Sequence, residues 1–370
     1  MGFEYTNAKN LTNISSSAND FEAEDSILET GLKTASYSCL FLVSVLGNCL
    51  VILAYKLNSN GKLRTVSNNF IVSMAAADLL ITVGSVPERM TRILANDTWL
   101  LPGTLGIAVC KAVNFIEKLS MNVSVLHLVS IAVDRFLVVF FPRRKFITKT
   151  LSHRIILSIW LISSGYCLPI LIYGKILEEN GKMYCKVRKF FSNWKIWFIF
   201  FLIILFGTFL LIVIIYSAIA VKLWRKKTPG VRLSFRSRRT EKLNIRIVKM
   251  VAMIVTVFYV CFLPYWIGWV FCSYHFNEVI CSSRYIFIAI FLSYSNSSLN
   301  PIIYTIFNEN FRFAFRLLWR KLFCVKANGG LREHADVFVV GLHLEQITFP
   351  TESKTKVTKS RSLDFLGTKL

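Results

Sequence analysis

The sequence predicts an all-α membrane protein, a bundle of seven transmembrane helices followed by a short amphipathic helix on the membrane surface. Of the 370 residues, 54% are hydrophobic, which is more apolar surface than a soluble domain of this length needs. Seven stretches reach the length of about 20 largely apolar residues with which a helix crosses a bilayer. Basic residues collect in alternate loops between these stretches, as they do in membrane proteins.

The predicted order is an extracellular N-terminal segment (1–33), seven spans, a surface helix (309–324) and a disordered cytoplasmic tail (325–370). We place the spans at 34–57, 66–94, 106–141, 153–175, 195–225, 241–274 and 284–308. The surface helix is predicted from the basic, aromatic run Phe311–Phe323. Cys324 follows this run and is a candidate for palmitoylation.

Loop charge orients the bundle in the membrane. The cluster Arg143-Arg144-Lys145 and the long basic loop 222–249 mark one face as cytoplasmic. The N-terminal segment, with acidic residues between Glu22 and Glu29, is therefore outside. The formal net charge of +23 follows from this topology and the anionic inner leaflet, so nucleic-acid binding is not required. We expect a multi-pass plasma-membrane protein in contact with membrane lipids.

Outer cysteines and glycan acceptors fit this topology. Of nine cysteines, Cys110 and Cys185 fall on the oxidising outer side, and a bridge between them would hold the loop 174–195 over the mouth of the bundle. Cys272 and Cys281 flank a shorter outer loop and are a second possible pair. The predicted glycosylation sites, each an outer Asn-X-Ser/Thr sequence, are Asn10, Asn13 and Asn96.

The third span carries a polar stripe on an otherwise apolar helix. Glu117 and Arg135 are about five helical turns apart, so they face the same way. Charged groups inside a membrane are costly unless they face protein or trapped water. We therefore expect this stripe to face the interior of the bundle, either as packing residues or as part of a functional site.

Short motifs along the spans resemble those of one receptor family. In chain order they are Gly47-Asn48, Asp78, Asp134-Arg135-Phe136, Cys261-Phe-Leu-Pro264 and Asn300-Pro-Ile-Ile-Tyr304. Together they resemble the rhodopsin-like G-protein-coupled receptors over roughly residues 33–324. The resemblance implies an outer ligand pocket and a cytoplasmic surface that activates a heterotrimeric G protein when the helices rearrange.

Asp78 is a carboxylate near the middle of the membrane, where it needs partners or a cation. In the receptors that the sequence resembles, the matching positions hold a sodium ion. The residues that would supply further oxygens here are Ser124, Asn296, Ser297 and Asn300. The alternative is a neutral, hydrogen-bonded Asp78 without an ion.

Two prolines and one ion pair are the predicted activation switch. Pro264 and Pro301 each remove a backbone hydrogen bond and create a hinge, which lets the cytoplasmic helix ends move. Asp134 makes the charge of Arg135 tolerable, and by resemblance the pair opens on activation so that Arg135 meets the G protein. The other predicted switch residues are Tyr216, Phe258, Phe262 and Tyr304.

Three departures from the family pattern concern this switch. Phe262 stands where the family usually has Trp, and Thr208 stands where the fifth helix usually has Pro. No acidic residue near Asn244 is placed to clamp Arg135. Because the Trp and the clamp each restrain the resting state, their absence predicts appreciable basal signalling.

Two other functional classes are open to a membrane bundle. A transporter or channel would show an internal repeat or a charged pathway. A membrane enzyme would need metal ligands, paired carboxylates or a Ser–His pair inside the spans. The sequence has none of these, and His127, alone on an apolar helix face, is expected to be a packing residue. A receptor rather than an enzyme is therefore predicted.

The ligand class depends on the outer halves of the spans. Light sensing is excluded, because the seventh span has Tyr294 where a retinal Schiff base would need lysine. A biogenic-amine ligand is the alternative, although such receptors carry Asp where this chain has Glu117, and helix-five serines where it has Phe200, Phe201 and Phe206. A mixture of charge and large rings suits a peptide better, so the sequence most resembles neuropeptide-type receptors. The predicted ligand-binding residues are Glu88, Arg92, Glu117, Tyr265, Trp266, Trp269 and Tyr294.

Glu117 is predicted to bind a positive group of the ligand, because a buried carboxylate without a partner is costly. Arg92 is the competing partner, whereas Lys118 is expected to point about 100° away around the helix. At the other end of the chain, the hydroxyl run from Thr351 to Ser362 is predicted to recruit arrestin when phosphorylated. A solvated tail without this role is the alternative.

Overall fold

The computed structural model describes residues 26–57, 61, 63–179, 181–186, 192–225, 235–274 and 280–323. The chain up to Arg316 forms one compact unit, and of the second unit only residues 317–323 are described.

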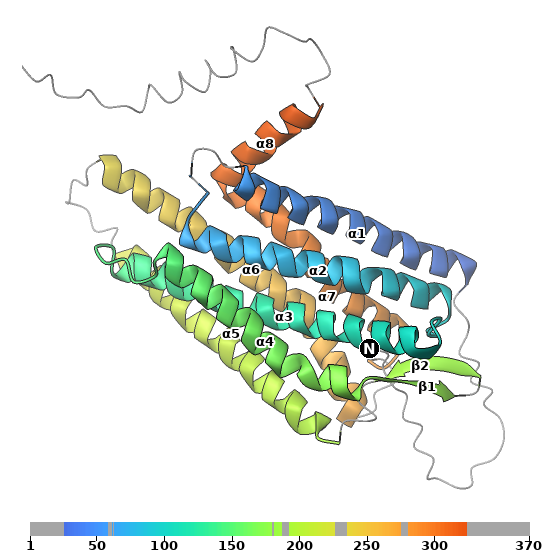
Figure 1. Ribbon diagram of the computed structural model, residues 1–370. Helices are drawn as coiled ribbons and strands as arrows, with labels where there is room; N and C mark the ends of the chain where they lie inside the picture. Colours follow the sequence, from blue (N-terminus) through green and yellow to red (C-terminus); the bar gives the residue numbers. More distant parts are fainter. Residues whose placement is uncertain are drawn as a thin grey trace, which may run out of the picture. The chain divides into compact units, whose positions relative to one another are not determined.

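The described part of the chain contains eight helices and one hairpin (Figure 1). The helices are α1 (Ile27–Lys56), α2 (Val66–Leu94), α3 (Gly103–Phe140), α4 (Lys149–Tyr173), α5 (Trp194–Arg225), α6 (Phe235–Tyr274), α7 (Ser283–Phe307) and α8 (Glu309–Phe323). Each helix from α1 to α7 contains a stretch long and apolar enough to cross a membrane. The predicted seven-helix bundle with a short helix after the last span is therefore confirmed.

Side-chain caps set where several helices begin, because a hydroxyl accepts a hydrogen bond from the backbone N–H three residues later. The capping residues are Ser26, Thr65, Thr148 and Ser282. The cap on α1 starts this helix at Ile27, ahead of the span predicted from residue 34. Since α6 begins at Phe235, a large part of the predicted basic loop 222–249 is helical.

A β-hairpin lies between α4 and α5, where the sequence predicted only a loop. Its strands are β1 (Lys175–Glu179) and β2 (Lys182–Lys186), paired antiparallel with Ile176 opposite Cys185. Gly181 makes the turn with a φ of +74°, which glycine adopts without strain. The all-α prediction holds for the bundle but misses this hairpin.

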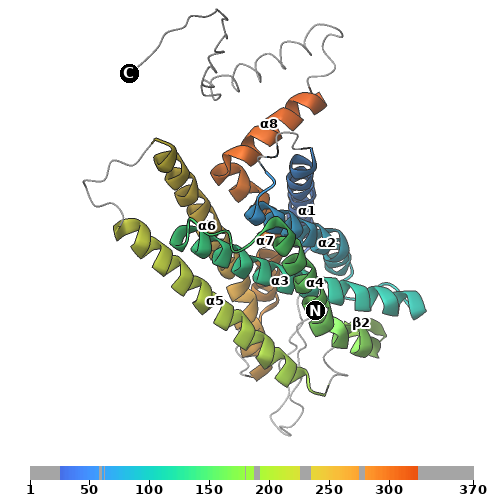
Figure 2. The same cartoon turned by 60° about the vertical axis from the view of Figure 1, so that its left-hand side comes forward.

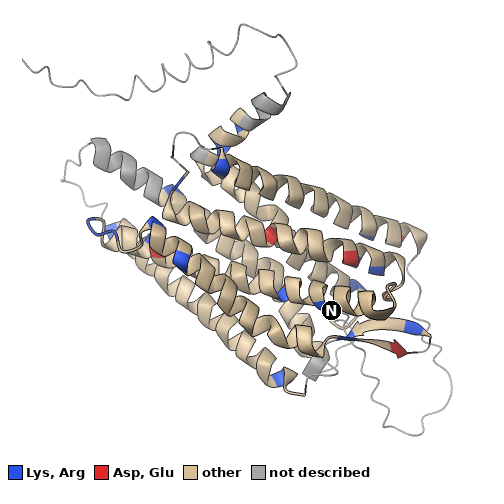
Figure 3. Ribbon diagram, viewed as in Figure 1, with Lys and Arg blue, Asp and Glu red and all other residues tan. Residues whose placement is uncertain are grey.

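The helix α3 lies at the centre of the bundle and contacts α2, α4, α5 and α6 (Figure 2). The outer surface is apolar: α5, for example, exposes Ile196, Phe200, Ile203 and Phe206. Few charged residues occur along the middle of the bundle (Figure 3). Such a surface is suited to hydrocarbon, and the polar groups that remain inside mark the candidate sites.

Candidate functional site

Two disulfides link elements at one end of the bundle. Cys110 in α3 is bonded to Cys185 in β2, with a Cα–Cα distance of 5.8 Å. Trp99 packs against this bridge, and its backbone N–H donates to a β2 carbonyl over 2.8 Å. Cys272 in α6 is bonded to Cys281, just before α7. Both outer cysteine pairs considered from the sequence are therefore bridged.

Glu117 in α3 is surrounded by cations and hydroxyls. Its Oε1 lies 2.7 Å from the Lys118 ammonium, and its Oε2 accepts a 3.1 Å hydrogen bond from the Tyr294 hydroxyl. A guanidinium nitrogen of Arg89 lies 3.6 Å from the same Oε2. Lys118 also donates to the Tyr265 hydroxyl over 3.1 Å. Because the Glu117 side chain is only 12% exposed, its charge is balanced by groups inside the protein.

This arrangement corrects two expectations about Glu117. Lys118 does not point away, because its four-carbon stem lets the ammonium turn back to the neighbouring carboxylate. Arg92 is not the competing partner; Arg89, which sequence reasoning missed, is. The two arginines are three residues apart and share a helix face. The inward position predicted for Arg92 therefore also applies to Arg89.

Acidic and basic side chains alternate from Glu117 to the outer surface. A nitrogen of Arg89 lies 3.8 Å from Glu88, which is 3.4 Å from Arg92. Arg92 in turn lies 2.9 Å from Asp97, whose side chain is 57% exposed. The charged series, as we call this set, consists of Lys118, Glu117, Arg89, Glu88, Arg92 and Asp97.

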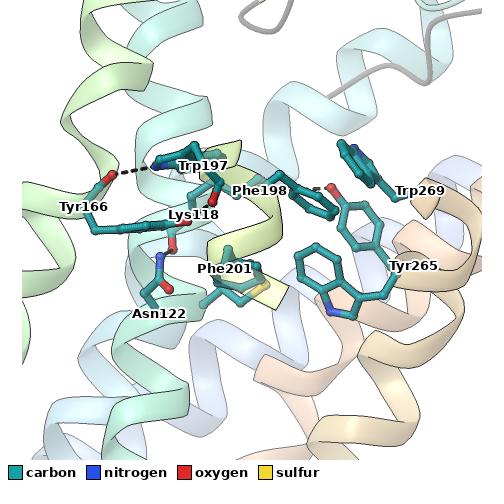
Figure 4. Close-up of a pocket in the computed structure, with 10 residues that line it drawn as sticks. Lys118, Asn122, Tyr166, Trp197, Phe198, Phe201, Tyr265 and Trp269 are labelled. Carbon is teal, nitrogen blue, oxygen red and sulfur yellow. Dashed lines mark hydrogen bonds between the residues drawn. The ribbon is translucent and has the colours of Figure 1, made fainter. Parts of the chain in front are cut away.

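A small aromatic cavity lies beside Lys118, between α3, α4, α5 and α6 (Figure 4). The residues that line it are Lys118, Met121, Asn122, Tyr166, Trp197, Phe198, Phe201, Tyr265, Trp266 and Trp269. Lys118 is the one charged member of this lining. Of the helix-five phenylalanines singled out in the sequence, Phe201 lines the cavity, whereas Phe200 and Phe206 are exposed on the outside of the bundle.

The predicted ligand-binding residues fall into two places. The aromatic residues of α6 line the cavity; these are Tyr265, Trp266 and Trp269. The others belong to the charged series or contact it; these are Glu88, Arg92, Glu117 and Tyr294. Lys118 joins the two places, because it lines the cavity and is bonded to Glu117.

Asp78 in α2 is 2% exposed. The Asn300 amide donates to its carboxylate over 2.9 Å, and the Ser297 side chain is a second hydrogen-bond partner. Ser124 and Asn296 are buried as well. Among the described residues, nothing donates to the buried side-chain oxygens of Asn296 and Asn300. Unused oxygens on and next to the residues that bond Asp78 fit a small, hard cation such as sodium.

At the end of α3 opposite the disulfide, Arg135 is bonded to the neighbouring Asp134. It donates to Asp134 Oδ2 over 2.5 and 3.1 Å, and the Ser67 hydroxyl of α2 donates to the same oxygen over 2.7 Å. The hydroxyls of Tyr216 in α5 and Tyr304 in α7 are buried and, within the part of the chain that is described, have no hydrogen-bond partner. They are therefore available for new partners if the helices move.

Two prolines interrupt the backbone hydrogen bonds of the last two spans. Pro264 lies inside α6 and Pro301 inside α7. The Tyr285 hydroxyl of α7 donates to the Pro264 carbonyl over 2.9 Å. One turn before Pro264, the Phe258 and Phe262 rings pack with centroids 4.6 Å apart, and Phe258 is buried.

A second ion pair joins α6 to the start of α8. Arg246 is paired with Glu309, and both side chains are about half exposed. The sequence predicted no acidic clamp near Asn244, whose side chain lies outside the described part. In this pair the acid comes from α8 and bonds an arginine of α6 rather than Arg135.

One of the predicted modification sites lies within the described residues. Asn96 is exposed in the turn after α2. The remaining ones lie outside the described residues: Asn10, Asn13, Cys324 and the hydroxyl run 351–362. His127 is buried, with its Nδ1 2.6 Å from the carbonyl of Val123, as expected for a packing residue.

Comparisons with known proteins agree with this geometry. The family model "7 transmembrane receptor (rhodopsin family)" matches residues 47–304, more than half of the chain. The chain is 31% identical over 310 residues to a QRFP-like peptide receptor of Branchiostoma floridae, covering 79% of each chain. It is 29% identical to a RYamide receptor of Tribolium castaneum, covering 78% of this chain and 81% of the relative. It is 28% identical to the Substance-K receptor of Bos taurus, covering 79% and 76%. The chain therefore belongs to the rhodopsin family of seven-transmembrane receptors and is a multi-pass membrane protein.

Proposed function

We propose that this receptor lies in the plasma membrane with its N-terminus outside, binds an extracellular peptide and activates a heterotrimeric G protein. The orientation is supported by the basic loops on one face and the two disulfides at the opposite end. Coupling to a G protein is what the family membership leads us to expect.

The contacts that Glu117 already makes within the protein are the observation that favours a peptide ligand over an amine. Its carboxylate already has Lys118, Tyr294 and Arg89 within 3.6 Å. A small amine would therefore find no free acid in α3, whereas a peptide can use the charged series and the aromatic cavity together. The names of the three relatives agree, since each is a receptor for a peptide.

The signal would pass from the cavity to the cytoplasmic face through α6 and α7. The hinges at Pro264 and Pro301 let the inner halves of these helices move while the disulfides hold the outer ends. Arg135 would then leave Asp134 and meet the G protein, and the free hydroxyls of Tyr216 and Tyr304 would bond to it in the new arrangement.

The polar core around Asp78 would hold a sodium ion in the resting state. Its carboxylate would supply the charge, and the oxygens would come from Ser124, Asn296, Ser297 and Asn300. A cation balances the buried carboxylate, which is costly when alone.

Further expectations concern the ends of the chain. Asn10, Asn13 and Asn96 would carry glycans, and Cys324 would carry a palmitoyl group that strengthens the contact of α8 with membrane lipids. Phosphates on the hydroxyl run 351–362 would recruit arrestin.

The test is a screen in transfected cells. Candidate peptides and biogenic amines are applied, and calcium and cyclic-nucleotide responses are recorded beside mock-transfected cells. A response to a peptide that disappears with Arg135→Ala at equal surface density is expected. A response to an amine alone would overturn the peptide assignment.

A further inference from the structure

The buried part of the charged series has more cations than anions. Lys118, Arg89 and Arg92 are at most 8% exposed in their side chains, and they face only two buried carboxylates, Glu117 and Glu88. The third acid of the series, Asp97, lies 2.9 Å from Arg92 but is 57% exposed, so water screens its charge more than that of the buried carboxylates. One further negative charge would therefore make the buried set neutral.

Lys118 is the member of this set that a ligand can reach from the cavity. An ammonium has three N–H donors, and two of them are used, by Glu117 at 2.7 Å and by the Tyr265 hydroxyl at 3.1 Å. Glu117 does not line the cavity, whereas Lys118 does (Figure 4). A group that enters the cavity meets the ammonium before it meets the carboxylate.

The walls of the cavity favour an aromatic ring. Phe198, Phe201 and Trp266 offer ring faces and edges to such a side chain.

A cationic group is the competing occupant, because aromatic walls also attract cations. That role is already filled, since the Lys118 ammonium lies 5.1 Å from the centre of the Tyr265 ring. A second cation beside it would be repelled in a poorly hydrated space. An anionic oxygen group would instead receive the third hydrogen bond of Lys118.

We propose that the ligand places in this cavity an aromatic ring with a carboxylate close to it, and that Lys118 binds this carboxylate. The inference rests on the proposed peptide-receptor function and replaces the expectation that Glu117 binds a positive group. The carboxylate can come from a free C-terminus or from an acidic side chain beside the aromatic residue.

The test is thermal unfolding of the purified full-length receptor with small probes at about 10 mM, roughly ten times the Kd expected for fragments of this size. The probes are N-acetylphenylalanine, its neutral amide, the cation phenethylamine and N-acetyl-aspartyl-phenylalanine amide. We expect one or both acids to raise the melting temperature by roughly 2 to 4 °C, while the amide and the amine do not. Stabilisation by the first acid assigns the carboxylate to a C-terminus, and stabilisation by the last assigns it to a side chain.

Variants identify the residue. Lys118→Gln should abolish the shift and Lys118→Arg should keep most of it. Lys33→Gln is the matched control, because Lys33 is also a buried outer lysine paired with a glutamate, at 3.0 Å from Glu29, and should leave the shift unchanged. If Lys118→Gln does not fold, the comparison of acid, amide and amine on the unaltered receptor still shows whether the cavity binds a carboxylate.

The proposal is overturned if neither acid stabilises the receptor, or if phenethylamine does and Glu117→Gln removes its effect. Because unfolding needs no signalling, this outcome is separate from that of the peptide screen.

Discussion

Asn48 in α1 donates a hydrogen bond over 3.0 Å to the backbone carbonyl of Ser297 in α7. This carbonyl lies four residues before Pro301, which has no N–H to bond it within the helix. Asn48 therefore satisfies an acceptor that the proline leaves free. The neighbouring Gly47 allows the approach, because a Cβ at this position would lie 2.8 Å from the Pro301 Cβ. The Gly-Asn pair in α1 is thus explained by the hinge in α7.

Gly47→Ala should destabilise the receptor by about 1 to 3 kcal/mol, because the added methyl group overlaps the Pro301 ring. The measurement is the melting temperature of the purified protein. Gly165→Ala in α4 is the control, since a Cβ there meets nothing within 4 Å, and the better helix former should leave stability equal or slightly higher. Equal melting temperatures for the two variants would contradict the close packing of α1 on α7.

Reversing one charge of the Arg246–Glu309 pair should raise basal signalling. If the pair holds α6 against α8 in the resting receptor, its loss favours the open arrangement by up to about fivefold, since an exposed ion pair contributes at most about 1 kcal/mol. Arg246→Glu and Glu309→Arg should each show the effect in G-protein activation without ligand, and the double variant should restore the original level. Arg316→Glu reverses a charge elsewhere on α8 and should change nothing. Single variants that signal like the unaltered receptor would rule out this restraint.

Arg135→Ala should remove G-protein activation while leaving delivery to the cell surface intact. The residue sits near the end of α3 that we propose to be cytoplasmic. It is held only by Asp134 in the described structure, so its loss leaves one carboxylate that Ser67 still bonds. The measurement is nucleotide exchange at matched surface density, with Arg144→Ala in the following exposed loop as control. Normal exchange in Arg135→Ala would show that another residue makes the contact.

The sequence was sufficient for the parts of the molecule that the bilayer dictates. A span must be long and apolar, and a buried charge must face inward, so the seven helices and the inward face of Glu117 followed from composition and helical period. The Asp134–Arg135 pair followed because adjacent opposite charges at a membrane boundary have few other partners. Where α1 begins did not follow, because Ser26 caps it in a stretch too polar to be read as membrane.

The sequence did not predict which partner each side chain of the charged series bonds. Periodicity assigns a Cβ direction, but the last atoms of lysine and arginine lie several bonds away and go to the nearest carboxylate. This is why Lys118 bonds Glu117 although their Cβ atoms diverge, and why Arg89 takes the place expected for Arg92. The hairpin was missed for a related reason: its five-residue strands are stabilised by the bridge at Cys185 rather than by an apolar pattern of their own.

Sodium should stabilise the receptor through Asp78. Replacing choline chloride with sodium chloride at equal ionic strength should raise the melting temperature, by an amount equivalent to about 1.4 kcal/mol at ten times the Kd. Asp78→Asn keeps the hydrogen-bonding shape but removes the charge, and should abolish the difference between the two salts. Asp97→Asn, an exposed acid, should keep it. An equal sodium effect in Asp78→Asn would place the ion elsewhere.

Glu117→Gln should lower the stability of the receptor even without ligand, and this separates a structural charge from one kept for a ligand. The change leaves Lys118 and Arg89 buried without their shared carboxylate, which typically costs about 3 to 5 kcal/mol. The double variant Glu117→Gln with Lys118→Gln removes one anion and one cation together, leaving Arg89 with Glu88, and should recover a large part of the loss. Melting temperatures of the two single variants and the double variant give the coupling energy directly. If the losses of the single variants simply add, Glu117 and Lys118 do not act as a pair, and Arg89 and Tyr294 are the partners that stabilise the carboxylate.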